Sequence, residues 1–478
     1  MSFKKSFFKN ISNFATFSYI SQGFEFFSTI ILSRLLVPEE YGFVAIILVF
    51  VNFMHLFSSL GIQASIVRSD YGRTYHKHLN SLAIWIGFGL ALSMMILAYP
   101  IAIFFENNKL IIPAMLVSFR FIFESFEHVP SAYLSKILKF NNLGVANLLK
   151  SSFQIVFTII LAFLGFSYWS LIIPLIFSPL VAYAYLNKHV GLPLKLYGWG
   201  ATKMIFLKIR SLMGHLSLSH IFTYWSGNLD KVIVARLYTQ ADLGLYNRAF
   251  RFIMIATNLI SNIFSRVLFP SLKKLMKEKG DVSKEFFDIL RIISLFNMPI
   301  VLILLLFPKE LVIILWGNDW IGVSDLLPYV AVILIFTSMF RAASPVYLLY
   351  NSEKMYTRVN IFNAVTRLIF IIIGGLISIN HILMFIVLNS IFVNLPVQAY
   401  FGFYKSFGYN KKVILKFWIP HMLIGFGLFL SIYFESIILR IAVLIIFNLL
   451  LLVNLRTTIR ETFRYLKDAL LKKRKLRS

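Results

Sequence analysis

The chain has 478 residues, of which 59% are hydrophobic and only 14% are charged. A soluble fold of this composition would expose a large apolar surface and aggregate, so the composition excludes a soluble protein of two or three domains. Apolar stretches of about 20 residues, long enough to cross a bilayer as helices, recur along the whole sequence. Because they are continuous rather than alternating, they predict an all-α integral membrane protein.

The formal net charge of +27 would suggest a nucleic-acid partner in a soluble protein. Here the basic residues lie between the apolar stretches, so we relate them to membrane topology and predict no nucleic-acid partner. The absence of Cys excludes disulfides and Cys-based metal sites, and the nine His residues show no metal-ligand spacing. No phosphate-binding glycine loop or zinc-protease motif is present. We therefore predict a transporter rather than an enzyme, with no metal and no cofactor.

Fourteen apolar segments lie along the chain, and we predict that each is a membrane-spanning helix. In chain order they are Phe14–Leu36, Phe43–Val67, Leu79–Phe105, Leu110–Leu134, Val145–Phe166, Tyr168–Leu186, Leu212–Leu237, Leu245–Leu268, Phe286–Phe307, Leu326–Leu349, Asn360–Ile379, Ile382–Phe403, Val413–Phe434 and Ile437–Leu455. Lys and Arg are concentrated in every second connection and are sparse in the short connections between them. By the positive-inside rule, this alternation places both termini in the cytoplasm.

A short motif occurs twice, each time between two predicted spans. The first copy contains Arg34, Glu40 and Gly42, and the second contains Arg236, Asp242 and Gly244, with a constant offset of 202 residues. Duplicated halves in a very hydrophobic chain are typical of transporters. We therefore predict two pseudo-symmetric six-helix lobes that run in the same direction, followed by two further helices.

The repeat and the longest interior gap divide the chain into five parts. They are an N-terminal lobe (10–186), a cytoplasmic linker (187–210), a C-terminal lobe (211–404), helices 13 and 14 (405–455) and a basic cytoplasmic tail (456–478). The tail keeps its apolar residues on one face among many Lys and Arg, which predicts an amphipathic helix on the anionic inner leaflet.

Charged residues inside predicted spans are the candidates for function, because they are costly there. Arg120 and Glu124 are four residues apart and can pair on one helix face. That pair is either a structural ion pair between helices or part of a cavity in which the acid titrates or the arginine meets substrate.

The second lobe carries more basic than acidic residues within its spans. Arg248 and Arg251 share a face, and neither has an acidic residue three or four positions away. They either line a cavity or pair near Asp230 or Asp242. Substrate-cavity candidates are Arg120, Arg248, Arg251, Arg341, Arg367 and Lys231, and candidates for H+ or Na+ coupling are Glu25, Glu124 and Asp230. The arginine excess suits an anionic substrate such as a diphosphate.

The repeated motif itself has two interpretations. In a structural role, the arginine closes the helix at the outer surface, the acid either pairs with that arginine or lies near the next helix N-terminus, and the glycine permits a tight turn. The alternative is a role in gating.

Several segments of the sequence resemble signatures of a known family. Leu32–Gly42 with Leu60–Ala64, Asn228–Lys231, Leu243–Tyr246, Val267–Pro270 and Trp316–Trp320 are similar to segments of the polysaccharide transporter family, the Wzx-like branch of the multidrug/oligosaccharidyl-lipid/polysaccharide (MOP) exporter superfamily. The resemblance covers nearly the whole chain.

The resemblance implies a flippase of the bacterial cell (inner) membrane. Members move undecaprenyl-diphosphate-linked oligosaccharides for O-antigen (lipopolysaccharide), capsule or exopolysaccharide by alternating access between two six-helix lobes. It also implies ion coupling and contact with polysaccharide polymerase or chain-length proteins. Three alternatives stay open: a MATE-type cation-coupled drug antiporter, a lipid II flippase, and a membrane scaffold that transports nothing.

Overall fold

The computed structural model describes residues 3–58, 73–192, 194–278 and 280–433, together with residues 62, 65, 66, 438, 442 and 445. This part of the chain is helical throughout, with short connections and no strand. Seven of its helices are long and apolar enough to cross a membrane, in agreement with the predicted all-α membrane fold. They are Tyr75–Phe104, Phe140–Phe163, Trp169–Val190, Val282–Leu306, Lys354–Gly375, Ile379–Ser406 and Lys411–Leu430.

The chain divides into two compact units. Unit 1 comprises residues 1–245 and 315–320, and unit 2 comprises residues 246–314 and 321–478. The division groups residues by compactness, whereas the predicted lobes 10–186 and 211–404 follow the repeat, and those boundaries stay a prediction.

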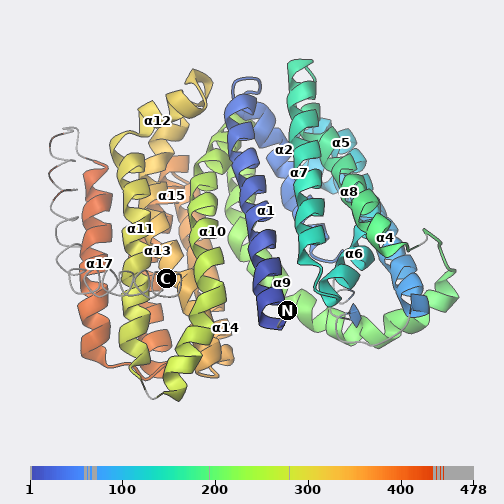
Figure 1. The fold of residues 1–478 in the computed structure, drawn as a ribbon. Coiled ribbons are helices and arrows are strands. Elements are labelled where there is room, and N and C mark those ends of the chain that lie inside the picture. The colour runs from blue at the N-terminus through green and yellow to red at the C-terminus, as the bar shows by residue number, and fades with distance from the viewer. Residues whose placement is uncertain are drawn as a thin grey trace, which may run out of the picture. The chain divides into compact units, whose positions relative to one another are not determined.

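Unit 1 is built from helices of the first half of the chain and the beginning of the second (Figure 1). Its helices are α1 (Phe3–Leu32), α2 (Pro38–His55), α4 (Arg73–Phe104), η1 (Asn108–Leu110), α5 (Ile111–Val117), α6 (Phe119–Lys136), α7 (Phe140–Phe163), α8 (Trp169–Val190), α9 (Trp199–Leu237), the start of α10 (Gln240–Lys277) and η2 (Asn318–Trp320). Helix α7 packs between α1 and α8, and α6 packs between α4 and α8.

Unit 2 contains the remainder of α10 and the later helices. These are α11 (Val282–Leu306), α12 (Pro308–Leu315), α13 (Val323–Leu349), α14 (Glu353–Gly375), α15 (Ile379–Asn389), η3 (Ser390–Asn394), α16 (Leu395–Val397), η4 (Gln398–Ser406) and α17 (Lys411–Ser431). Helix α13 contacts α11, α15 and α17, so it lies at the centre of the unit. The segments η3 and η4 are π-helical, which widens the continuous helix that starts with α15.

Helix α4 shows how the sequence builds a lipid-facing helix. Leu92, Ile96, Tyr99 and Ile103 recur at helical spacing and are between 57% and 65% exposed. The opposite face carries small residues such as Ala98 and Ala102, which are fully buried. In lipid, large apolar side chains can face outward while small ones allow helices to approach closely. The pattern therefore places the bulky stripe of α4 toward the bilayer.

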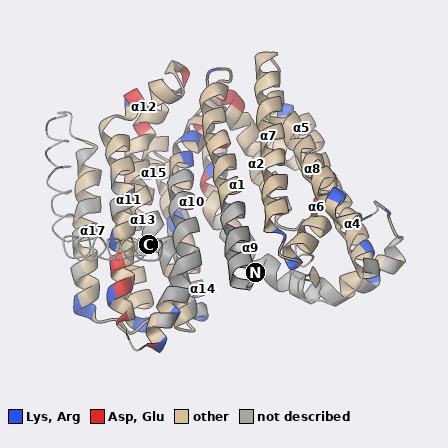
Figure 2. Cartoon of the chain, viewed as in Figure 1, with Lys and Arg blue, Asp and Glu red and all other residues tan. Residues whose placement is uncertain are grey.

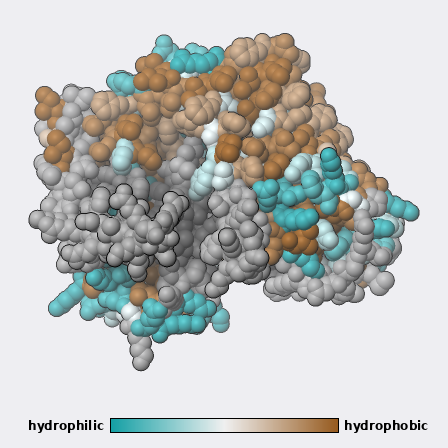
Figure 3. All heavy atoms as spheres, viewed as in Figure 1, coloured by the Kyte–Doolittle hydropathy of each residue, from teal (hydrophilic) through white to brown (hydrophobic). Residues whose placement is uncertain are grey.

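The distribution of charged and hydrophobic residues also fits a membrane protein. In Figure 2, α4, α7 and α8 are uncharged over most of their length. In Figure 3, hydrophobic residues cover much of the visible described surface. The protein is therefore a multi-pass membrane protein, since a soluble protein would not present such a surface to water.

Several helix ends differ from the prediction. Helix α2 ends at His55, where we predicted one span from Phe43 to Val67, and residues 56–58 form a turn. Helix α9 begins at Trp199, so only residues 191–198 of the predicted linker are not helical, and residue 193 among them is not described. The bounds of the linker between the lobes, 187–210, stay a prediction. Predicted helix 14 lies largely outside the described residues, and the tail 456–478 lies wholly outside them.

Two glycines on α4 give a matched test of the packing between α4 and α6. A Cβ on Gly87 would lie 2.7 Å from the Phe121 carbonyl oxygen of α6, whereas a Cβ on Gly89 would meet nothing within 4 Å. We expect Gly87→Ala to destabilise the fold by about 1–3 kcal/mol through overpacking. Gly89→Ala should be neutral or stabilising by up to about 1 kcal/mol. Thermal unfolding in detergent checks both, and equal midpoints for the two variants would contradict the α4–α6 packing.

Candidate functional site

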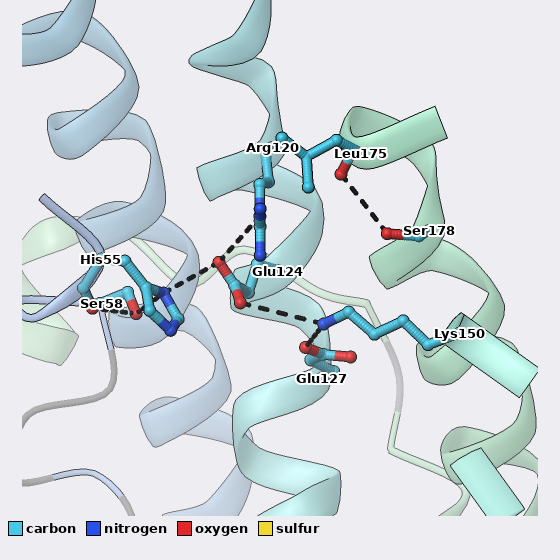
Figure 4. A network of polar contacts seen from close by, with 8 residues as sticks. All are labelled: His55, Ser58, Arg120, Glu124, Glu127, Lys150, Leu175 and Ser178. Atoms are coloured by element: carbon cyan, nitrogen blue, oxygen red, sulfur yellow. Dashed lines mark hydrogen bonds and ion pairs between the residues drawn. The ribbon is translucent and has the colours of Figure 1, made fainter. Parts of the chain in front are cut away.

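A buried carboxylate, Glu124, collects charged neighbours from three helices of unit 1 (Figure 4). Glu124 lies on α6 and is 4% exposed. Its carboxylate is 3.1 Å from His55 Nδ1 at the end of α2, and 3.7 Å from Arg120 Nε one turn earlier on α6. Lys150 Nζ, from α7, lies 3.9 Å from the other carboxylate oxygen. The spacing of Arg120 and Glu124 predicted their contact, and the structure confirms it.

Glu127 supplies a second carboxylate. Lys150 Nζ donates to Glu127 Oε1 at 2.5 Å, so the lysine lies between the two acids (Figure 4). Arg120 and Lys150 carry two positive charges and Glu124 and Glu127 two negative charges, so the cluster is neutral when its histidines are neutral. An ion in low dielectric costs several kcal/mol unless it is compensated, and here the compensation comes from across helices. We call His55, Arg120, Glu124, Glu127 and Lys150 the charge cluster.

The charge cluster is partly exposed, and a further buried histidine lies near it. The His55 side chain is 42% exposed, so the cluster is reachable through it. His128 Nε2, on α6, is buried and has no hydrogen-bond partner among the described residues. A proton on either glutamate would leave Arg120 and Lys150 with a single negative partner. The cluster can therefore convert a protonation change into a change of contacts between α2, α6 and α7.

Lys150, His55 and Glu127 were not among the predicted site residues. Lys150 lies within the predicted span Val145–Phe166, and a lysine inside an apolar span was a signal that could have indicated it. His55 also lies within a predicted span, but a neutral histidine there gives no clear signal. Their meeting with Glu124 depends on how α2 and α7 pack against α6, which sequence spacing does not show.

Asp230, Lys231 and Glu25 are the other candidates in unit 1. In unit 1, Asp230 is buried and accepts the Lys231 backbone N–H at 2.9 Å, while Lys231 Nζ donates to Asn228 Oδ1 at 2.9 Å. Glu25 is exposed on α1.

The remaining arginine candidates belong to unit 2. Arg248 is buried on α10, and Arg251 and Arg367 are half-buried on α10 and α14. Arg341 lies on α13, but its side chain is outside the described residues. Their proposed contact with substrate stays a prediction.

Both acids of the repeated motif cap the following helix. Glu40 accepts the Val37 N–H at 3.0 Å and also the Ser167 hydroxyl. Asp242 accepts the Thr239 N–H at 3.1 Å and its hydroxyl at 2.8 Å. These are capping-box contacts at the starts of α2 and α10. The position of the acid near the next helix N-terminus is as predicted.

The predicted role of the motif glycines is wrong. Neither Gly42 nor Gly244 has a positive φ, so neither is needed for a tight turn. Each is the fifth residue of its helix, where the neighbouring backbone leaves no room for a Cβ. Glycine is required at these positions because another segment of backbone approaches closely, and not because the chain needs a conformation that only glycine adopts.

With this geometry described, comparison with known proteins gives the family. A profile of the family described as "Polysaccharide biosynthesis protein" matches residues 31–325, which is more than half of the chain. The chain belongs to this family. The resemblance to Wzx-like polysaccharide transporters of the MOP exporter superfamily is thereby confirmed.

Relatives of the chain come from several bacteria. An "Uncharacterized membrane protein in cps region" of Klebsiella pneumoniae is 26% identical over 349 residues, covering 72% of this chain and 71% of the relative. The "Lipopolysaccharide biosynthesis protein WzxC" of Escherichia coli (strain K12) is 22% identical over 404 residues, covering 82% and 80%.

Solved structures with the same fold are transporters and flippases. The "Lipid II flippase MurJ, inward closed conformation" has a TM-score of 0.68 at 16% identity, covering 94% of this chain and 99% of that one. A "multidrug resistance MATE family transporter of the MOP superfamily" in an inward-facing conformation has a TM-score of 0.63 at 14% identity, covering 85% and 95%. At these identities the likeness shows the fold of the polysaccharide transporter and not its cargo.

The charge cluster predicts a compensating pair of substitutions. Lys150→Met leaves two buried carboxylates with Arg120 and the titratable His55 as their partners in the cluster, so we expect a loss of about 3 kcal/mol in unfolding free energy. Adding Glu127→Gln removes the uncompensated charge and should restore most of that loss. Lys109→Met, at an exposed position, is the control. Thermal unfolding in detergent at neutral pH measures all variants, and a double variant as unstable as the sum of its single substitutions would show that the two residues do not pair.

Proposed function

We propose that this protein is a flippase that moves an undecaprenyl-diphosphate-linked oligosaccharide repeat unit across the cytoplasmic membrane. The observation that carries the proposal is membership of the polysaccharide biosynthesis family over residues 31–325. The structure adds support, because a charge cluster is kept inside apolar helices at a cost that a passive scaffold has no reason to bear. The chain then acts as a transporter and forms no covalent bond.

The proposed architecture is fourteen membrane helices in two six-helix lobes plus two C-terminal helices. The repeated motif at an offset of 202 residues and the alternation of basic loops support it. In this arrangement the protein lies in the bacterial inner membrane with both termini in the cytoplasm. Polymerase and chain-length proteins would receive the cargo on the opposite side.

The proposed cargo-binding groups are the arginines of the second half of the chain. A diphosphate is recognised well by guanidinium groups, which donate in parallel pairs. Arg248 and Arg251, three residues apart on α10, are the first candidates, followed by Arg367, Arg341 and Lys231. Arg120 was predicted as a further member, but its contact with Glu124 favours a role inside the charge cluster.

The charge cluster is the proposed coupling site, with H+ as the coupling ion. Sodium needs several oxygen ligands, whereas the groups that contact Glu124 and Glu127 are nitrogens of His55, Arg120 and Lys150. A proton needs only one carboxylate oxygen. Protonation of Glu124 or Glu127 would release Lys150 from one of its two partners and loosen α7 from α6.

The proposal is tested in a bacterium that lacks this gene. We expect surface polysaccharide to disappear and undecaprenyl-diphosphate-linked repeat units to accumulate on the cytoplasmic side, where mass spectrometry identifies the glycan. The wild-type gene should restore the polymer, and Arg248→Ala or Arg251→Ala should restore at most a tenth as much while the protein still inserts. Normal export by both variants would remove these arginines from the cargo site.

Other outcomes of the same experiment distinguish the alternatives. Accumulation of a lipid-linked peptidoglycan precursor would replace our proposal with a lipid II flippase. Normal polymer together with sensitivity to cationic drugs would replace it with a MATE-type antiporter.

A further inference from the structure

The two copies of the repeated motif touch each other in unit 1. A Cβ on Gly42 would lie 1.7 Å from the Gln240 carbonyl oxygen, and a Cβ on Gly244 would lie 2.0 Å from the Pro38 carbonyl oxygen. Both distances are far below any real Cβ contact, and the neighbour is backbone, which cannot rotate away. The first turns of α2 and α10 therefore cross at a point where only glycine fits.

This crossing is reciprocal. Pro38 and Gln240 are separated by the same 202 residues as Gly42 and Gly244. Each glycine thus contacts the residue that is equivalent to the one its counterpart contacts. A contact of i with j matched by j with i is the property of an interface around a two-fold axis. The reciprocal contact therefore relates the two copies of the motif by a local pseudo-two-fold.

Three further contacts join the first half of the chain to α9. Arg236 of the second copy pairs with Glu106 at 2.6 Å, after the end of α4, and its guanidinium lies 5.9 Å from the centre of the Phe104 ring. The Tyr224 hydroxyl of α9 donates to the Val49 carbonyl of α2. Residues of the first half of the chain are thereby held against α9 and the start of α10.

A strap from the later part of the chain covers the first copy. In residues 315–320, the buried Trp320 donates its indole N–H to the Ser33 carbonyl at 2.9 Å and packs edge-on against Tyr41, with ring centroids 5.2 Å apart. Gly317 has a φ of +92°, and a Cβ there would lie 2.8 Å from an Arg34 guanidinium nitrogen. The strap therefore lies directly on the arginine of the first copy.

We propose that the Gly42–Gly244 crossing, the Glu106–Arg236 pair and the Trp320 strap form a reversible latch that closes the outer end of the transport path. This inference rests on the proposed function, and it assigns the motif its gating role. The joined segments are the short connections poor in Lys and Arg, which are predicted to face outward. Cargo that enters from the cytoplasm can leave outward only when this latch opens.

The composition of the latch suits repeated opening. The glycines interlock no side chains, and the Glu106–Arg236 pair is solvent-exposed, so its contribution to stability is small. Trp316 and Trp320 supply two large buried anchors of the strap. Because the backbones of α2 and α10 fit together this closely, they can pack in only one register. The closed state of the latch is therefore well defined although the contacts that stabilise it are weak.

Cysteine cross-linking tests the latch, because the natural chain contains no Cys. The double variant Glu106→Cys with Arg236→Cys places two exposed thiols across the latch, and a bis-methanethiosulfonate reagent can bridge them from outside. We expect export of newly labelled polymer to fall at least tenfold on cross-linking and to recover on reduction. Each single variant treated with the same reagent should export normally.

The outcomes separate the latch from the proposed function. Normal export by the fully cross-linked double variant would overturn the latch and leave the flippase proposal intact. If the strain that lacks the gene instead makes surface polymer normally, the flippase proposal is overturned.

Alanine at the crossing gives a second readout that does not need transport. In the double-cysteine background, Gly42→Ala or Gly244→Ala should slow cross-linking at least fivefold, because the α2 and α10 backbones can no longer approach. Gly23→Ala on α1, where a Cβ meets nothing within 4 Å, is the matched control and should leave the rate unchanged. An unchanged rate in Gly42→Ala and Gly244→Ala would show that the crossing does not close the latch.

Discussion

Compensation of charge inside an apolar helix bundle is the constraint on which the interior of unit 1 depends. Glu124 could not remain ionised among lipid-facing helices without the cations that reach it from α6 and α7, and Lys150 could not remain charged without Glu124 and Glu127. Each ion therefore fixes the position of a neighbouring helix. The same dependence makes the cluster responsive, because one proton changes the balance for α2, α6 and α7 together.

The glycine crossing imposes a second constraint, on backbone rather than on charge. It joins the two copies of the motif without side-chain interlocking, whereas the charge cluster joins helices of one predicted lobe through side chains. A transporter that moves its lobes as rigid bodies needs strong contacts within a lobe and weak, well-registered contacts between lobes. The observed distribution of contacts in unit 1 supports this division of roles.

Much of the account follows from local sequence patterns, and the remainder from tertiary packing. The Arg120–Glu124 contact follows from four-residue spacing, and the capping by Glu40 and Asp242 from their place beside a helix start. Lys150 meets Glu127 only because α7 packs beside α6, and no spacing along the chain encodes that. The sequence shows the repeat and its offset. It does not show that the two copies contact each other, and for this reason the sequence alone favours a turn role for the glycines.

Translocation by the purified protein is the most direct test of the central claim. The protein is reconstituted into liposomes with a fluorescent undecaprenyl-diphosphate-linked oligosaccharide in both leaflets, and a membrane-impermeant quencher is added outside. We predict that the inner-leaflet fraction also becomes quenched, and that the double variant Glu106→Cys with Arg236→Cys loses this activity when cross-linked. Quenching confined to the outer-leaflet fraction, as in protein-free liposomes, would contradict the account.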